Sequence, residues 1–150
     1  MENTKRNKII YWIATAWLSL GMVSSGMVQL LRVQEETDMM ARLGYKPYVM
    51  TILGAWKLLG VTAVLIPRFP LLKEWAYAGF FFAMTGALFS HLACGDEAME
   101  FFGPSLLLAL TVLSWYFRPA NRKMQAINMQ QTLRDTSMQL KPHPKSFSPG

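Results

Sequence analysis

Lys57 is the residue of this sequence best placed to do chemistry, because it lies ten residues inside an otherwise apolar or small run, residues 47–66. A charged side chain at such depth in a bilayer is costly and usually marks a function. Gly54 and Gly60 lie three residues to either side, so all three share roughly one face of a helix. The ammonium is therefore predicted to point into a helical bundle, where it can bind an anion or a quinone, or transfer a proton.

Polar residues near one end of the apolar runs are the candidate partners of Lys57, since no acidic residue occurs in the middle of any run. The candidates for ligand binding, together with Lys57, are Gln29, Thr51, Ser90 and His91. They predict a polar vestibule above the lysine. The alternative is that Lys57 extends its ammonium to the headgroups, or is buried in its neutral form, and binds nothing.

Four apolar runs must position these residues: 9–31, 47–66, 71–92 and 101–117. A membrane-spanning helix needs about 20 such residues. Only 16% of the chain is charged and 52% is hydrophobic, which is unusual for a soluble domain. The sequence predicts an all-α fold, a transmembrane four-helix bundle over residues 1–119, followed by a short basic tail, residues 120–150, which we expect to be largely disordered.

The charges between the runs predict the topology, because cytoplasmic segments carry the excess of Lys and Arg. One side collects eleven of them, including both terminal segments, and the other side has three. Both termini are thus predicted to be cytoplasmic, in a bacterial inner membrane. A cleaved signal peptide is the alternative for the first run, which is longer than the hydrophobic region of a typical signal peptide. The net charge of +6 is attributed to topology and lipid contact, and no nucleic-acid-binding module is recognisable.

Small residues in the third run recur at helical spacing, which allows close helix packing in lipid. They are Ala76, Gly79, Ala83, Gly86 and Ser90. Gly79, Ala83 and Gly86, together with Gly54 and Gly60 of the second run, are predicted to lie at helix contacts in the bundle centre.

Signals for metal or thiol chemistry are weak. His91 has only Cys94 and Asp96 nearby in sequence, and a metal site normally needs three or four ligands in a recognised spacing, so no metal site is predicted. Cys94 is the only cysteine, so an intramolecular disulfide is excluded. The motifs of nucleotide-dependent enzymes and hydrolases are also missing, which argues against a self-contained enzyme but allows a subunit of an oxidoreductase.

Two motifs give the chain a resemblance to a known family. The first is Gly-x-x-Lys-Leu-x-Gly, beginning at Gly54, and the second is Pro-x-x-Pro-x-x-Lys-Glu-Trp, beginning at Pro67. Together with Gly86-Ala87 and Ser90-His91, they resemble the DoxX-like family of bacterial membrane proteins over roughly residues 11–119. The resemblance implies a four-helix bundle with both ends inside, mostly without an assigned reaction. It also implies an acidic residue in close relatives where this chain has Ala83.

Two functions of different class follow. The family takes its name from a subunit of a thiosulfate:quinone oxidoreductase, which implies a redox-associated subunit in which Lys57, Gln29 and His91 hold a quinone or a small sulfur-containing anion. The alternative is a non-catalytic membrane scaffold or assembly factor, whose small-residue face binds a membrane protein partner or a second copy of the chain. Solute transport is favoured less, because four spans without an internal repeat do not match the usual transporter architecture.

Overall fold

The computed structural model describes residues 2–119, 122 and 136. Its helices are α1 (Glu2–Leu30), α2 (Gln34–Arg42), α3 (Pro47–Leu65), α4 (Pro70–Cys94), the short 3-10 helix η1 (Ala98–Phe101) and α5 (Phe102–Tyr116). The predicted disordered tail, residues 120–150, lies outside the described residues apart from 122 and 136.

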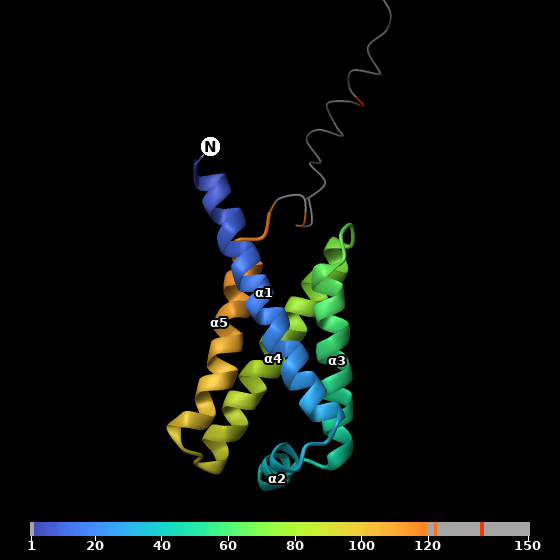
Figure 1. Cartoon of the computed structure of the whole chain (residues 1–150), viewed down its shortest axis with the longest axis vertical. Helices are drawn as coiled ribbons and strands as arrows, with labels where there is room; N and C mark the ends of the chain where they lie inside the picture. The colour runs from blue at the N-terminus through green and yellow to red at the C-terminus, as the bar shows by residue number, and fades with distance from the viewer. Residues whose placement is uncertain (1, 120–121, 123–135, 137–150) are drawn as a thin grey trace, which may run out of the picture.

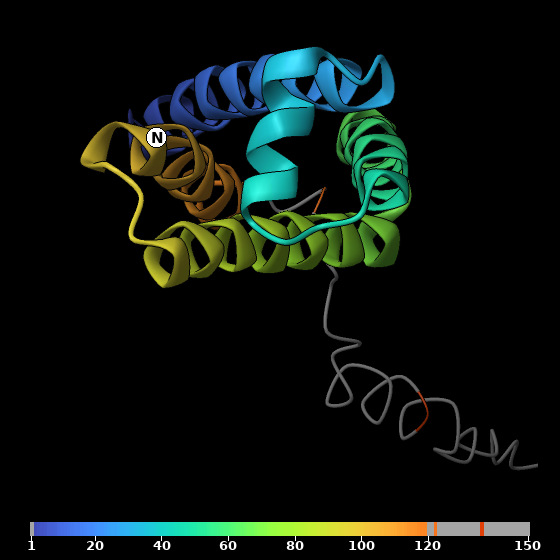
Figure 2. The ribbon, with the colours of Figure 1, turned by 90° about the horizontal axis from the view of Figure 1, so that it is seen from below.

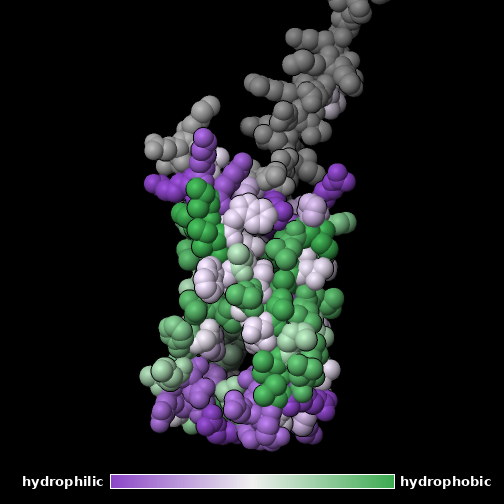
Figure 3. All heavy atoms as spheres, viewed as in Figure 1, coloured by the Kyte–Doolittle hydropathy of each residue, from purple (hydrophilic) through white to green (hydrophobic). Residues whose placement is uncertain are grey.

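Four helices are long and apolar enough to cross a membrane: Thr4–Leu30, Pro47–Leu65, Pro70–Cys94 and Ala98–Tyr116. This confirms the prediction of an all-α, multi-pass protein. Helices α1, α3, α4 and α5 form one elongated bundle (Figure 1). Its surface has an apolar band between two hydrophilic ends (Figure 3). We call these the α2 end, where α2 lies, and the Arg118 end, where α1 begins and α5 ends.

Proline and glycine determine where the spans begin and end. Pro47 and Pro70 occupy the first turns of α3 and α4, where a missing backbone N–H costs nothing. Gly95 ends α4 with a φ of 68°, a left-handed conformation that glycine adopts without strain. The turn between α3 and α4 is therefore short, and it brings the start of α4 next to the end of α3.

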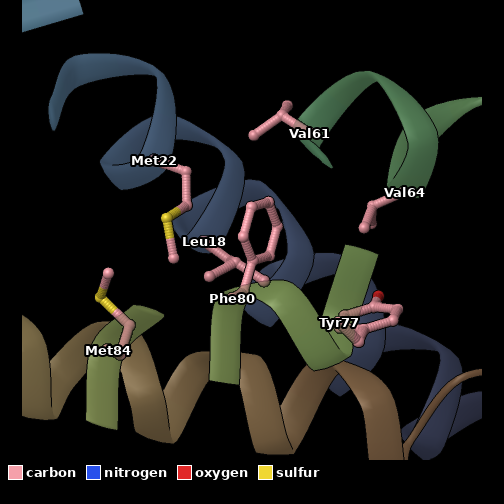
Figure 4. Packing of buried hydrophobic residues seen from close by; sticks show 7 residues of the cluster. All are labelled: Leu18, Met22, Val61, Val64, Tyr77, Phe80 and Met84. Atoms are coloured by element: carbon pink, nitrogen blue, oxygen red, sulfur yellow. The ribbon is translucent and has the colours of Figure 1, made fainter. Parts of the chain in front are cut away.

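The buried core is a cluster of side chains that pack against one another (Figure 4). Its residues come from α1, α3 and α4, and they are Leu18, Met22, Val61, Val64, Tyr77, Phe80 and Met84. Leu107, Leu108 and Leu110 of α5 pack against them. Because lipid tails are as apolar as these side chains, close packing rather than hydrophobicity holds the helices together.

The closest helix contacts are made at glycines. A Cβ on Gly54 would lie 2.8 Å from the carbonyl oxygen of Gly26, so the backbones of α1 and α3 touch there. A Cβ on Gly60 would lie 2.6 Å from the ring of Phe80. Gly54 and Gly60 therefore permit the approach of α3 to α1 and to α4.

Gly79 and Gly86 of α4 are placed differently from the prediction. A Cβ added at either position would meet no atom within 4 Å, so neither lies at a close helix contact within the chain. They share an exposed face of α4 with Phe82 and Phe89, each more than 70% exposed. Ala83, one position around the helix, packs against the core instead. The spacing of small residues in α4 identifies the face that they share. It does not identify what packs against that face, because the same pattern suits lipid and a partner helix equally.

Helix α2 is an element that the hydropathy pattern did not predict. Seen from below, it lies across the α2 end of the bundle (Figure 2). Glu35 and Glu36 in its first turn and Arg42 in its last turn match the helix dipole. Its Met40 is buried, while most of its other side chains are exposed or half-buried. The charged segment between α1 and α3 therefore folds back across the end of the bundle and covers it.

Candidate functional site

A cavity of about 520 Å³ lies under α2 and is bounded by α1, α3, α4 and α5. Its polar lining includes Ser25, Gln29, Glu36, Lys57, Ser90, His91 and Glu100. Leu53, Phe82, Met84 and Leu107 belong to its apolar wall. On the face shown in Figure 3, the surface is recessed near the α2 end. The predicted polar vestibule therefore corresponds to a hollow whose lining is partly polar and partly apolar.

Lys57 is the deepest charged group of this cavity. It is 7% exposed and lies on the buried stripe of α3, in helical register with Met50, Gly54 and Val61. Its ammonium donates a hydrogen bond of 2.7 Å to the hydroxyl of Ser25 on α1. Within the described part of the chain this is its one hydrogen-bond partner. An ammonium has three N–H donors, so two remain for a ligand.

Glu36 supplies a carboxylate that the sequence prediction missed, because it comes from α2 rather than from a span. Its Oε1 accepts a hydrogen bond of 3.0 Å from Nε2 of Gln29. Oε1 of Gln29 is buried and has no hydrogen-bond partner in the described structure. A buried acceptor without a partner is costly and invites a donor. The amphipathic pattern of 34–42, with Glu36 one turn before Met40, is the signal that could have found it.

His91 and Ser90 line the cavity near the end of α4, at the α2 end of the bundle. Nδ1 of His91 lies 2.7 Å from Oδ2 of Asp96, to which it donates, and both side chains are more than 90% buried. The hydroxyl of Ser90 lies 2.6 Å from that of Tyr45 and also donates to the carbonyl oxygen of Gly86. These two residues thus hold the segments after α2 and α4 in place, and their polar atoms are largely occupied.

Thr51 lies outside the cavity, unlike the other predicted site residues. It is exposed, and its hydroxyl accepts a hydrogen bond of 3.2 Å from Nη2 of Arg32. The reason is helical phase: six residues separate Thr51 from Lys57, which places them about 120° apart around α3. Residues one or two full turns from Lys57, such as Gly54 and Met50, share its face instead.

A second buried lysine, Lys73, lies at the Arg118 end and is only 1% exposed. Its ammonium donates to three backbone carbonyl oxygens at the end of α3, those of Ala63, Val64 and Ile66. The last carbonyls of a helix have no partner within the helix, so Lys73 caps α3 from the first turn of α4. All three of its donors are used.

The same end contains a buried polar network between α1, α4 and α5. The hydroxyl of Ser114 lies 2.7 Å from those of Thr15 and Tyr77. Glu74 pairs with Arg118 and accepts a hydrogen bond of 2.8 Å from Nε1 of Trp115. The first two residues of the motif Lys73-Glu74-Trp75 therefore have a structural role, at the end opposite the cavity.

Comparison with protein families adds one finding to this geometry. The sequence profile of the DoxX-like family matches residues 13–114, which is most of the chain. The chain belongs to the DoxX-like family. Comparison with curated proteins and with solved structures finds no match. The DoxX-like match covers most of the first and last spans, the whole of the second and third spans and of α2, and every residue that lines the cavity.

In this DoxX-like protein, Ala83 lines the same cavity as Lys57. An acidic residue at this position, which the resemblance implies for close relatives, would thus face the cavity. Here the carboxylate that lines it beside Gln29 is Glu36, from α2. In this DoxX-like chain the cavity is thus lined by a buried lysine from α3 and by an acid from α2.

Proposed function

We propose that this protein is a redox-associated subunit of the bacterial inner membrane, with both termini in the cytoplasm, and that it binds a quinone in the cavity beside Lys57. The observation that carries the proposal is the state of Lys57: a buried ammonium with one hydrogen bond, lining a cavity of about 520 Å³. A buried cation with free donors is expensive unless a ligand accepts from it.

The donor and acceptor groups of the cavity suit a quinone. A carbonyl oxygen of the oxidised form can accept from Lys57, and a hydroxyl of the reduced form can donate to Oε1 of Gln29, which has no other described partner. The apolar wall, with Leu53, Phe82 and Leu107, suits a flat ring and the start of an isoprenoid tail. The site thus offers both polar and apolar groups to a ligand that has both.

Charge favours a neutral ligand over a sulfur-containing anion. One cation, Lys57, lines the cavity together with two carboxylates, Glu36 and Glu100. His91 is already paired with Asp96. An anion would meet repulsion from Glu36 and Glu100, which a neutral quinone avoids.

The test is the quinone content of the full chain extracted into native-lipid nanodiscs, measured by mass spectrometry per mole of protein. Lys57→Met removes the donor, and Lys46→Met, an exposed lysine just before α3, is the matched control. A hydrogen bond to a charged group contributes about 1.5–3 kcal/mol, so Lys57→Met should lower quinone retention by about tenfold or more.

Equal quinone in wild type and Lys57→Met would contradict the proposal. So would a wild-type protein that retains a sulfur-containing anion in place of quinone. Lys46→Met should retain as much quinone as wild type, which controls for changes in surface charge.

A second candidate, a membrane scaffold, is supported by the exposed face of α4. Gly79 and Gly86 alternate there with Trp75, Phe82 and Phe89 at helical spacing, and both glycines have open space above them. Ridges of aromatic rings beside small residues allow another helix to approach closely. We propose this face as the contact for a partner helix or for a second copy of the chain, should the cavity prove to be without a ligand.

The scaffold hypothesis predicts that Gly79→Leu lowers association with a partner or a second copy, measured by native mass spectrometry, whereas Lys57→Met does not. Ala78→Leu, on a neighbouring exposed position of α4, is the matched control. Unchanged association in Gly79→Leu would remove this candidate.

A further inference from the structure

We propose that the Arg118 end holds a second binding site, separate from the cavity, for a phosphate group, and that anionic lipid headgroups supply that phosphate. The site consists of Arg118 and Arg122, with Lys73 adding charge behind them. It is independent of the proposed quinone site, which lies at the opposite end of the bundle.

Positive charge at this end exceeds the negative charge that meets it. Lys73 and Arg118 are 1% and 4% exposed, and Arg122 is half-buried. Lys73 and Arg122 donate to the same oxygen, the carbonyl of Val64, at 2.6 and 3.4 Å. The described contacts of the three cations include one carboxylate, Glu74, which pairs with Arg118. Buried cations in excess of their counter-ions are costly and call for a further anion.

The guanidinium of Arg118 has unused donors that such an anion can accept from. Its Nη2 pairs with Glu74, but its Nε and Nη1 are buried and have no hydrogen-bond partner in the described structure. Lys73 cannot take this role, since its three donors are occupied by carbonyl oxygens. Phosphate oxygens are the acceptors that a guanidinium binds best.

Arg122 provides the second contact from the surface side. Its Nη1 donates to the hydroxyl of Tyr11 at 3.2 Å, and its Cζ lies 4.9 Å from the centre of the Trp12 ring. This stacking fixes the guanidinium plane over α1 and leaves the cation only partly covered. A headgroup can therefore approach Arg122 first and Arg118 behind it.

The depth of the site favours a lipid over a free ion. Aromatic residues with amphipathic rings gather at the headgroup level of membrane proteins. Three such rings surround this end and are exposed, namely Trp12, Trp115 and Tyr116. In the topology predicted from the charges, this end faces the cytoplasmic leaflet, where anionic lipids concentrate and basic pockets between helices bind their headgroups.

The test is native mass spectrometry of the full chain with equal amounts of dioleoyl phosphatidylglycerol and dioleoyl phosphatidylcholine. Wild type should retain the anionic lipid in preference to the zwitterionic one. Arg122→Gln and Arg118→Gln should each lower that preference by about fivefold, the effect of one basic residue near an anionic surface. Arg32→Gln, an exposed arginine at the α2 end, should leave it unchanged.

A second arm adds millimolar inorganic phosphate to the lipid mixture. Loss of phosphatidylglycerol on this addition would show that the site takes phosphate from either source, and retention would identify the lipid as the ligand. Equal retention of the two lipids by wild type overturns the proposal. The same holds if Arg122→Gln, which leaves the Glu74–Arg118 pair intact, keeps the full preference, so the outcome does not depend on whether Arg118→Gln folds.

Discussion

Lys57 and Lys73 are both buried lysines in apolar helices, yet they are held in opposite ways. Lys73 uses all three donors on the carbonyl oxygens that end α3. Lys57 has one described hydrogen bond, to Ser25, and borders a cavity. Lys73 satisfies the carbonyl oxygens at the end of α3, whereas Lys57 has two unused donors beside the cavity. Burial alone therefore does not distinguish the two lysines, whereas the number of unused donors does.

The two ends of the bundle differ in the same sense. At the Arg118 end, Thr15, Tyr77 and Ser114 satisfy one another by short hydrogen bonds. At the α2 end, the polar groups line a space, and Oε1 of Gln29 lacks a described partner. Substitutions of these hydroxyls should act on stability, whereas substitutions around the cavity should act on ligand retention; Nε and Nη1 of Arg118, which also lack a described partner, are the exception at the Arg118 end.

Lys73→Met should have the largest effect on stability. It leaves the carbonyl oxygens of Ala63 and Ile66 without this donor and that of Val64 with only the longer bond from Arg122, at about 1–3 kcal/mol for each oxygen left unpaired, so we expect a loss of about 3 kcal/mol. The measurement is the free energy of unfolding in mixed micelles, followed by circular dichroism. A loss no greater than that of Lys57→Met would end the distinction between the two lysines.

Gly54→Ala should come next. The new methyl group would lie 2.8 Å from the carbonyl oxygen of Gly26, a backbone atom that cannot rotate away, so α1 and α3 must separate. Overpacking of this kind costs about 1–3 kcal/mol. Gly79→Ala is the same substitution in open space and should not destabilise the protein. Both variants are compared by thermal unfolding, and equal behaviour would show that the contact at Gly54 is unimportant.

Ser114→Ala should cost less, about 1–2 kcal/mol, because it removes the hydroxyl shared by Thr15 and Tyr77 in a buried site. Ser90→Ala at the cavity should cost under about 1 kcal/mol, since the Tyr45 hydroxyl that it leaves is exposed. The measurement is the free energy of unfolding of the two variants by chemical denaturation. A larger loss for Ser90→Ala than for Ser114→Ala would contradict the expected difference between the two ends.

Lys57→Met should have the smallest effect on stability, within about 1 kcal/mol in either direction. Replacing a buried charge by an apolar side chain of similar length is often neutral. The same unfolding assay applies, with Lys73→Met as the contrast. A loss of several kcal/mol would show that Lys57 is structural, and the quinone proposal would then lose its main support.

The sequence predicts the spans well because hydropathy in a bilayer is nearly a local property. All four apolar runs are helical in the structure. The polar residues predicted near Lys57 line one cavity with it, except Thr51. That exception follows from helical phase, since two residues near the same membrane edge can still point in different directions around α3.

Long-range folding explains what the sequence did not predict. Glu36 reaches the cavity only because α2 folds across the bundle, and a short amphipathic helix carries a weak signal among charged neighbours. In the sequence, Lys73 is simply one of the positive charges between two spans. Its capping role depends on the tight turn between Pro67 and Pro70, which brings α4 back to the end of α3.

The apolar core also separates the polar groups of the cavity from those of the Arg118 end. Along α1, Leu18 and Met22 lie between Thr15 and Ser25; along α4, Phe80 and Met84 lie between Tyr77 and His91. Among the described residues of this core cluster, Tyr77 at its edge is the one with a hydrogen-bonding side chain. Within the described core cluster the side chains offer no chain of hydrogen bonds for a proton, so we expect little proton transfer through it between the two polar ends.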